Sequence, residues 1–264
     1  MHSGAIDGAE NAVKVIFNAD DYGVHPDISR GIREAMIHGV VRSTSVLSNC
    51  VTDEELEELK KLSSRGISVG VHLNLTRGRP VAFFPQGMLR ADGSFEKTAV
   101  YSPMGVPVLD SQLLRCEFEA QIEKLAPFEP THLDGHHHIH SFWNTFSIAS
   151  RLAKHYGLAL RAVNADMRKA LKRRGIPCCD YFISGFFGKN NVSVANLMAL
   201  LKMARPSGAA IVEVMCHPGY WGRLPARFSS YRKERERELE VLTSRELKRA
   251  LSREGVDVVS YHEL

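Results

Sequence analysis

Strands and helices alternate along the first part of the chain, and this alternation constrains the fold more than any other feature. An apolar, β-branched run at residues 13–17 is followed by a helical pattern at 27–38, where Asp27 stands at the N-cap position. The series continues with a strand pattern, a helix pattern with capping-box residues and another strand pattern (43–49, 53–62 and 67–75). Strands joined by helices at this spacing predict an α/β fold with a parallel sheet or barrel.

The proline- and glycine-rich stretch 76–110 interrupts this rhythm. We interpret it as a loop insertion or small subdomain that serves as a lid, because long loops inside compact domains are usually functional; a disordered insertion is the alternative. Residues 165–188 predict a loop with a helix. Elsewhere the patterns predict helices at 112–125, 142–156, 192–204 and 243–254, and strands from 131 and at 158–163, 210–216 and 256–261. No repeat or linker is present, so we expect one domain over residues 1–264.

Composition narrows the class of protein. With 264 residues and 44% hydrophobic content, the chain can bury a full core. The net charge of +4 is weak evidence for a polyanionic partner, because basic residues are mixed with acidic ones; the mixed run 232–240 predicts a solvated helix face rather than a nucleic-acid surface. Five scattered cysteines predict reduced thiols. Without a secretory signal or a membrane-spanning run, we expect a cytoplasmic protein.

The run 131–140 concentrates five of the twelve histidines and Asp134 in ten residues. A hydrophobic core has little use for so much imidazole. The flanking residues predict a strand that ends in a loop, and α/β enzymes place their chemistry at such strand ends. A metal site is therefore the first hypothesis.

Other strands end in the same way. Four strand patterns finish in side chains that can bind a metal or carry a proton: Asp20 and Asp21, His72, Asp134 and His136, and Glu213 and His217. Because the carboxyl ends of parallel strands cluster on one face, these distant positions are expected to converge in space. The coincidence of four such ends is stronger evidence than any single motif.

One aspartate and two histidines leave coordination positions open for water and substrate. A carboxylate beside the ion can act as general base, and a histidine opposite can protonate a leaving group. Side chains alternate along a strand, so Asp20 and Asp21 can both reach one site only if the chain bends there. If the site carries out a hydrolysis, its oxyanion is expected to bind the ion and backbone N–H groups near Tyr22 and Gly23.

The remaining histidines have several interpretations. On an extended backbone His136, His138 and His140 would share a face opposite His137, but a loop would remove this alternation. We interpret His137, His138 and His140 as residues that support the ligands or contact the substrate. His132, at the start of the strand, is expected to be a packing residue.

Further polar residues are expected around the site. Asp134 is suited to orient a ligand imidazole. Arg161, at a strand end, is expected to hold a substrate oxygen or to pair with a site carboxylate. Cys216 is interpreted as a buried structural thiol rather than a nucleophile. The full set of predicted substrate-binding or supporting residues is Tyr22, Asp134, His138, Arg161 and Glu213.

Together these segments resemble the YdjC-like carbohydrate deacetylases, which include the chitooligosaccharide (chitin disaccharide) deacetylases. The resemblance rests on four motifs in family order, at 18–23 (NADDYG), 70–76 (GVHLNLT), 131–140 (THLDGHHHIH) and 213–219 (EVMCHPG). It implies a distorted, incomplete (β/α) TIM-like barrel similar to that of polysaccharide deacetylases. Some relatives have Phe in place of Tyr22 and Ser in place of Gly135, and residues 78–110 resemble no particular specificity group.

The resemblance also implies roles for individual residues. Asp21, His72 and His136 would bind the metal, Asp20 would be the general base, and His217 would be the acid that protonates the departing amine. The metal implied by the family is Mg²⁺ or Zn²⁺, and two imidazoles with one carboxylate favour zinc or another transition ion.

The expected function is metal-dependent removal of N-acetyl groups from an amino sugar or short chitooligosaccharide, by a chain that forms a homodimer and binds neither nucleic acid nor membrane. Two alternatives remain. A metal-dependent hydrolase or lyase could act on another bond of a carbohydrate or phosphorylated substrate, and a non-catalytic module could bind a sugar without turnover.

Overall fold

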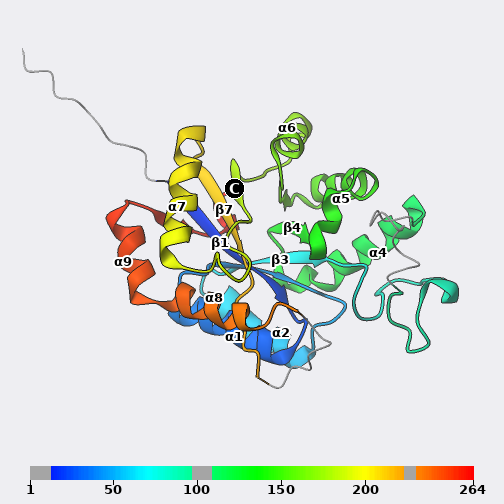
Figure 1. The fold of residues 1–264 in the computed structure, drawn as a ribbon. Coiled ribbons are helices and arrows are strands. Elements are labelled where there is room, and N and C mark those ends of the chain that lie inside the picture. The colour runs from blue at the N-terminus through cyan, green and yellow to red at the C-terminus, as the bar shows by residue number, and fades with distance from the viewer. Residues whose placement is uncertain (1–12, 97–108, 223–229) are drawn as a thin grey trace, which may run out of the picture.

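A single parallel sheet forms the centre of the molecule in the computed structural model, which describes residues 13–96, 109–222 and 230–264 (Figure 1). The strand order is β5-β4-β3-β2-β1-β7-β6, and β8 pairs with the start of β1. The strands are β1 (Lys14–Tyr22), β2 (Ser43–Val46), β3 (Ser68–Leu73), β4 (His132–Gly135), β5 (Ala159–Leu160), β6 (Tyr181–Ile183), β7 (Ile211–Cys216) and β8 (Asp257–Val259).

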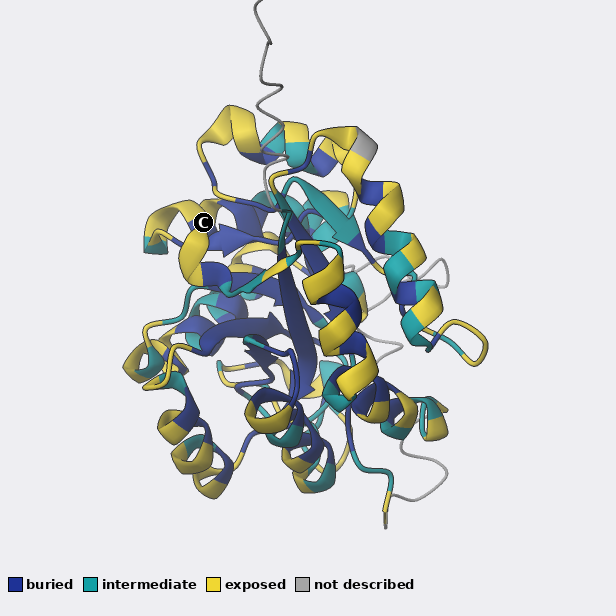
Figure 2. Ribbon diagram, turned by 90° about the vertical axis from the view of Figure 1, so that its left-hand side faces the viewer, coloured by how far each residue is buried: buried dark blue, intermediate teal, exposed yellow. Residues whose placement is uncertain are grey.

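Helices join the strands and cover the sheet. They are α1 (Pro26–His38), α2 (Asp53–Ser63), α4 (Ser111–Lys124), α5 (Trp143–Tyr156), α6 (Ala165–Arg174), α7 (Val194–Ala204), α8 (Lys233–Thr243) and α9 (Arg245–Arg253). Their buried stripes face the sheet and their exposed residues face outward, whereas the central strands are buried on both sides (Figure 2). Burial on both faces is why these strands are continuous apolar runs rather than alternating ones.

The sheet curls without closing, so the predicted incomplete barrel is confirmed. Strand β5 lies at one edge and β6 at the other, and no pairing joins these two strands in the described part of the chain. The parallel register places His72 opposite Asp134, and Asn18 opposite Ser43. Polar positions on neighbouring strands are thereby aligned at the carboxyl ends.

The structure differs from the sequence-based prediction at the start of α1, where the N-cap is His25 rather than Asp27, and in three further segments. Residues 181–183, within the predicted loop 165–188, form strand β6 beside β7. The predicted strand at 158–163 has only two residues. The histidine strand ends at Gly135, and the chain continues as a 3₁₀ helix, η3 (His136–Ser141), in which His137 and His138 have left-handed backbone angles.

The described part of the predicted lid, residues 76–96, is an ordered loop. The buried carboxylate of Glu117 on α4 accepts hydrogen bonds from the backbone N–H groups of Val81 and Ala82, at 3.0 and 2.8 Å. Phe84 packs edge-on against Phe95. Residues 97–108, the rest of the predicted lid, lie outside the described residues. No helix in the described ranges is long and apolar enough to cross a membrane.

A close contact between β3 and β4 gives a first testable prediction. A Cβ at Gly70 would lie 2.3 Å from Nε2 of His132, whose ring is itself stacked on Tyr261. We therefore expect Gly70→Ala to lower the free energy of unfolding by about 1–3 kcal/mol, measured by urea denaturation. Gly87→Ala is the matched control, because a Cβ there meets nothing within 4 Å. Equal stability of the two variants would contradict the packing described.

Candidate active site

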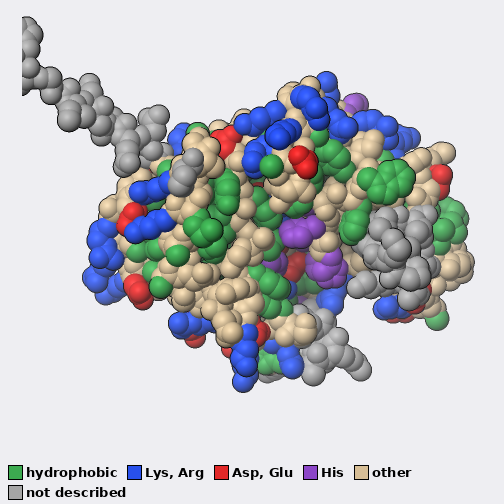
Figure 3. All heavy atoms as spheres, turned by 45° about the horizontal axis from the view of Figure 1, so that its top comes forward, with side chains coloured by type: hydrophobic (Ala, Val, Ile, Leu, Met, Phe, Trp, Pro, Cys, Tyr) green, Lys and Arg blue, Asp and Glu red, His purple; other side chains and the backbone are tan. Residues whose placement is uncertain are grey.

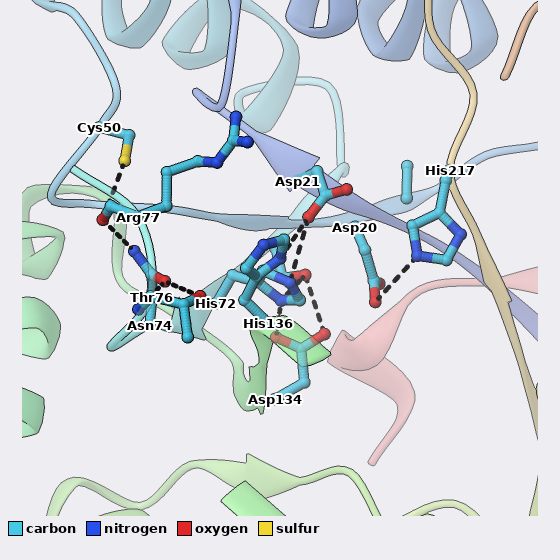
Figure 4. Close-up of polar contacts among 12 residues, drawn as sticks. Asp20, Asp21, Cys50, His72, Asn74, Thr76, Arg77, Asp134, His136 and His217 are labelled. Atoms are coloured by element: carbon cyan, nitrogen blue, oxygen red, sulfur yellow. Dashed lines mark hydrogen bonds and ion pairs between the residues drawn. The ribbon is translucent and has the colours of Figure 1, made fainter. Parts of the chain in front are cut away.

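The polar strand ends converge, as the sequence predicts, on one face of the molecule. Histidine and acidic side chains gather there in a hollow near the centre of the face (Figure 3). In close-up, Asp21, His72 and His136 face one another, with Asp134 on one side and Asp20 and His217 on another (Figure 4).

A bend at the end of β1 brings two adjacent carboxylates to the same site. Asp21 has a φ of 75°, and the register with β2 shifts between Ala19 and Tyr22. A positive φ interrupts the alternation of side chains, at a cost of roughly 1 kcal/mol for a residue other than glycine. Asp20 and Asp21 therefore both point into the site, through the bend that their adjacency requires.

The same bend turns Tyr22 away, which corrects the prediction that this residue contacts substrate or supports the site. Its hydroxyl donates to the carbonyl of Glu55 on α2 at 2.6 Å and accepts from Arg33 on α1. The ring is thus buried under the helices. The N–H of Gly23 donates to Ser29 Oγ at 2.9 Å, so the expected oxyanion contact is already occupied at this position.

Asp21, His72 and His136 form a group whose donor atoms lie within 4.8 Å of one another. Oδ1 of Asp21 is 2.9 Å from Nδ1 of His136 and 3.4 Å from Nε2 of His72. Two imidazoles and a carboxylate suit a divalent transition ion and leave positions open for water and substrate. These three residues fit a metal site.

A second group of the same kind, formed by Asp20, His72 and Asp134, fits a cation poorly. The guanidinium of Arg161 already lies between the two carboxylates, 2.7 Å from Asp20 and 2.9 Å from Asp134. A metal ion there would meet a fixed positive charge. The group around Asp21 is therefore the better metal site.

Asp134 orients His72. Its Oδ1 lies 2.8 Å from Nδ1 of His72, and its Oδ2 accepts a hydrogen bond of 2.8 Å from Ser45. With Nδ1 held by the carboxylate, Nε2 of His72 is directed toward Asp21. A carboxylate on the far nitrogen of a ligand imidazole fixes its tautomer and ring orientation.

Arg161 connects the acidic residues. It forms two hydrogen bonds of 2.7 Å to Asp20, an ion pair with Asp134 and one hydrogen bond of 2.8 Å to Glu213. The side chain is completely buried. Of the two expected roles for Arg161, the structure thus shows the pairing with site carboxylates. Glu213 is one of these partners and is completely buried.

These contacts determine the ionisation states of Asp20 and Asp21. Burial opposes ionisation of Asp20, but Arg161 outweighs it and lowers the pKa of Asp20. Burial also opposes ionisation of Asp21, and Arg235 and His136 hold its pKa well below the ordinary value. Asp20 and Asp21 are therefore both ionised at neutral pH, and the charged carboxylate of Asp21 is available as a metal ligand.

His217 approaches Asp20 from the end of β7. Its Nε2 is 4.0 Å from Oδ2 of Asp20, and its ring lies against Phe187 and Tyr231. Burial lowers the pKa of His217 to about 4, so the ring is neutral at neutral pH. A neutral imidazole must receive a proton before it can donate one.

The other histidines of the run lie around this group. His137 packs against the ring of His136, with centroids 4.0 Å apart. His138 lies edge-on to Phe182 and His140, and burial lowers its pKa. His140 is buried in the core, where burial lowers its pKa to about 3. The left-handed turn at 137–138 replaces the shared face that an extended chain would give.

Sequence reasoning missed two charged residues of α8. The run 232–240 was expected to be a solvated helix face, and this is wrong for Arg235 and Glu238, which are both buried. Arg235 lies 2.5 Å from Oδ2 of Asp21, and Glu238 accepts a hydrogen bond from the backbone N–H of His217. Both partners are far away in sequence, so the local charge pattern carries no signal of these contacts.

Two smaller polar residues were also missed. Asn18 donates to Asp20 at 2.8 Å, and Ser45 donates to Asp134. Here a signal existed, because Asn18 precedes Asp20 by two positions on the same strand face. Cys216 is fully buried, and its thiol donates to the carbonyl of Asn18, as expected for a structural cysteine.

With this geometry described, comparison with known proteins gives the class. A family model described as YdjC-like protein matches residues 14–253, and the chain belongs to this family. It is 32% identical over 254 residues to a carbohydrate deacetylase of Clostridium beijerinckii, covering 96% of this chain and 100% of the relative. It is 34% identical over 250 residues to a carbohydrate deacetylase of Geobacillus stearothermophilus, covering 94% and 96%.

Solved structures agree on the fold. The chain is similar, with a TM-score of 0.82 and 29% identity over 96% of this chain and 98% of the other, to a protein of Enterococcus faecalis V583 provisionally described as a cellobiose-phosphate cleavage protein. The Xyl-CE4 domain of a xylanase from the hindgut metagenome of Trinervitermes trinervoides has a TM-score of 0.52 at 9% identity, covering 96% and 89%. The latter likeness shows the fold alone.

The charge on His72 predicts how metal binding depends on pH. Burial disfavours the imidazolium, but Asp134 outweighs it and raises the pKa of His72 to about 10 in the metal-free protein. A metal ion must displace this proton, so Co²⁺ affinity should rise by about tenfold per pH unit between about pH 7 and about pH 9. Calorimetric titration in buffers of different ionisation enthalpy measures both the affinity and the proton released.

Asp134→Asn is the matched variant for this experiment. It removes the largest of the contributions that raise the pKa of His72, so the pH dependence of Co²⁺ affinity should shift to lower pH than in the unmodified protein. An affinity of the unmodified protein that did not change across this pH range would show that His72 carries no displaceable proton.

Proposed function

We propose that this protein is a metal-dependent hydrolase that removes N-acetyl groups from an amino sugar or short chitooligosaccharide, such as N,N′-diacetylchitobiose, and releases acetate. One observation carries the proposal. The group formed by Asp21, His72 and His136 lies directly beside Asp20, whose carboxylate is held ionised by Arg161, and His217 stands on the other side of Asp20. The curated relatives are named carbohydrate deacetylases, which supports the same reaction class.

A divalent ion held by Asp21, His72 and His136 would polarise the acyl carbonyl and lower the pKa of a water molecule. The two imidazoles favour Zn²⁺ or another transition ion over Mg²⁺, which prefers oxygen ligands. Arg235 holds Oδ2 of Asp21, so Oδ1 is the oxygen that faces the two histidines. Asp21 is therefore held in position by Arg235, a residue outside the proposed ligand group.

Asp20 acts as the general base. Its low pKa keeps the carboxylate ionised at neutral pH, and the paired guanidinium of Arg161 fixes its direction. The carboxylate takes a proton from the attacking water as the carbon–oxygen bond forms. The positive charge of Arg161 limits the basicity of the Asp20 carboxylate, so proton transfer depends on how far the pKa of the attacking water is lowered.

His217 delivers the proton to the leaving nitrogen. Its ring is neutral in the resting site, and Nε2, 4.0 Å from Oδ2 of Asp20, takes from Asp20 the proton that this carboxylate removed from water. The imidazole passes this proton to the amide nitrogen as the carbon–nitrogen bond breaks, which gives acetate and the free amine. Asp20 and His217 are then back in their starting states.

Release of acetate tests the reaction class. Metal-loaded protein incubated with N,N′-diacetylchitobiose should release acetate, and chelator-stripped protein should not, because the water is then not activated. An enzymatic acetate assay measures the product. Phosphorylated disaccharides belong in the same panel, since the similar Enterococcus faecalis V583 protein is provisionally described as a cellobiose-phosphate cleavage protein. Phosphate release or glycosidic cleavage without acetate would overturn the deacetylase proposal.

Two variants separate the base from a metal ligand. Asp20→Asn should keep bound metal and lose kcat by about 10²–10⁴-fold, because the amide cannot accept the proton. His72→Ala should lose the metal, measured by elemental analysis after dialysis. His155→Ala, which changes an exposed histidine on α5, should affect neither. Near-full activity of Asp20→Asn would refute the role of Asp20.

The hydrolysis requires a substrate with an acylated amine. The residues next to His217 are the ones expected to lie near the sugar ring that carries this amine. A homodimer stays a prediction from the sequence.

A further inference from the structure

One partly exposed aromatic ring stands beside the site without a role in the chemistry. Phe187, in the loop after β6, is 42% exposed, and its ring centroid lies 5.3 Å from that of His217. A partly exposed apolar ring of this size does not contribute the stabilising free energy that its full burial would give. Its place next to the proposed proton donor makes it a candidate for contact with substrate.

Buried groups hold this ring in place. Phe187 stacks on Tyr231, with centroids 4.2 Å apart and ring planes at 15°. The Tyr231 hydroxyl donates to Oε1 of Glu238 and accepts a hydrogen bond of 3.3 Å from the N–H of Gly188. An isolated surface phenylalanine has no such support.

Glu238 connects the ring to the chemistry. Its Oε2 accepts a hydrogen bond from the backbone N–H of His217, while its Oε1 accepts from Tyr231. The carboxyl group is completely buried. One rigid side chain on α8 therefore fixes the position of His217 and, through Tyr231, that of Phe187.

We propose that Phe187 is the stacking surface for the pyranose ring that bears the acylated amine, and that Tyr231 and Glu238 position this surface relative to His217. The inference rests on the proposed function and deepens it by assigning the sugar-binding residue. A pyranose with equatorial substituents has a flat face of C–H groups, which packs on an aromatic face and leaves its polar groups at the rim. A ring on Phe187 lies beside the imidazole that must reach its nitrogen substituent.

Substitutions at Phe187 test this assignment in the metal-loaded full-length protein. Phe187→Leu keeps an apolar side chain but removes the flat face, and Phe187→Tyr restores a flat face. For N,N′-diacetylchitobiose, Phe187→Leu should raise KM by about tenfold with kcat within about twofold, and Phe187→Tyr should return KM toward the unmodified value. N-acetylethanolamine, an acetamide without a sugar ring, should be hydrolysed equally by all three proteins.

A binding measurement and a control accompany the kinetics. Saturation-transfer NMR with the deacetylated disaccharide reports sugar binding without turnover, and Phe187→Leu should lose that signal. Met203→Leu is the control, because it changes another exposed apolar residue, on α7.

Each unfavourable outcome has a distinct meaning. If the unmodified protein releases acetate and Phe187→Leu keeps its KM and its NMR signal, the stacking surface is overturned and the deacetylase proposal stands. A lower kcat with unchanged KM also overturns it, since Phe187 would then only support His217. If the unmodified protein neither binds nor deacetylates any sugar of the panel, both proposals are overturned.

Discussion

The buried pairing of Arg161 with three carboxylates is the interaction on which the rest of the site depends. Arg161 follows the edge strand β5, and its partners Asp20, Asp134 and Glu213 lie on β1, β4 and β7. Because β5 and β7 lie at opposite sides of an open sheet, the guanidinium crosses the interior of the incomplete barrel. Its ion pairs link the two sides of the sheet, which no strand pairing joins within the described residues, at the level of the proposed base and metal ligands. A planar guanidinium with five donors can make two parallel hydrogen bonds to Asp20 and still contact two further carboxylates, whereas the ammonium of lysine has only three donors.

This arrangement has an energetic cost that bears on function. Taking several charges out of water is unfavourable, and a buried ion network of this kind is weak evidence for stability. The network keeps the carboxyl groups of Asp20 and Asp134 in their ionised form. Arg161 keeps Asp20 ionised and holds the pKa of Asp134 well below its ordinary value, and Asp134 in turn directs His72 toward Asp21. The proposed base and the proposed metal ligand are thus positioned through the same cation.

Sequence reasoning succeeded where the signal was local. The apolar strands and their polar ends follow from patterns of a few residues, and the adjacency of Asp20 and Asp21 already requires a bend. The same bend explains the error at Tyr22. Regular alternation would place it on the face of Asn18 and Asp20, whereas the positive φ of Asp21 turns it under the helices.

Arg235 and Glu238 could not be found from local patterns. Their partners lie about 214 and 21 residues away, and only the packing of α8 against the end of β1 and β7 removes these charges from water.

The origin of each residue divides the site into two parts. The groups proposed for the chemistry stand on strands or directly at their ends, where neighbouring strands fix each backbone position by hydrogen bonds. The residue proposed to contact the sugar and the ring that supports it stand on connections: Phe187 follows β6 and Tyr231 precedes α8. Loops accept changes in length and sequence that a parallel sheet does not. Catalysis and specificity can therefore vary separately in such a fold, and Glu238 is where they meet, because one carboxyl group holds both His217 and the aromatic pair.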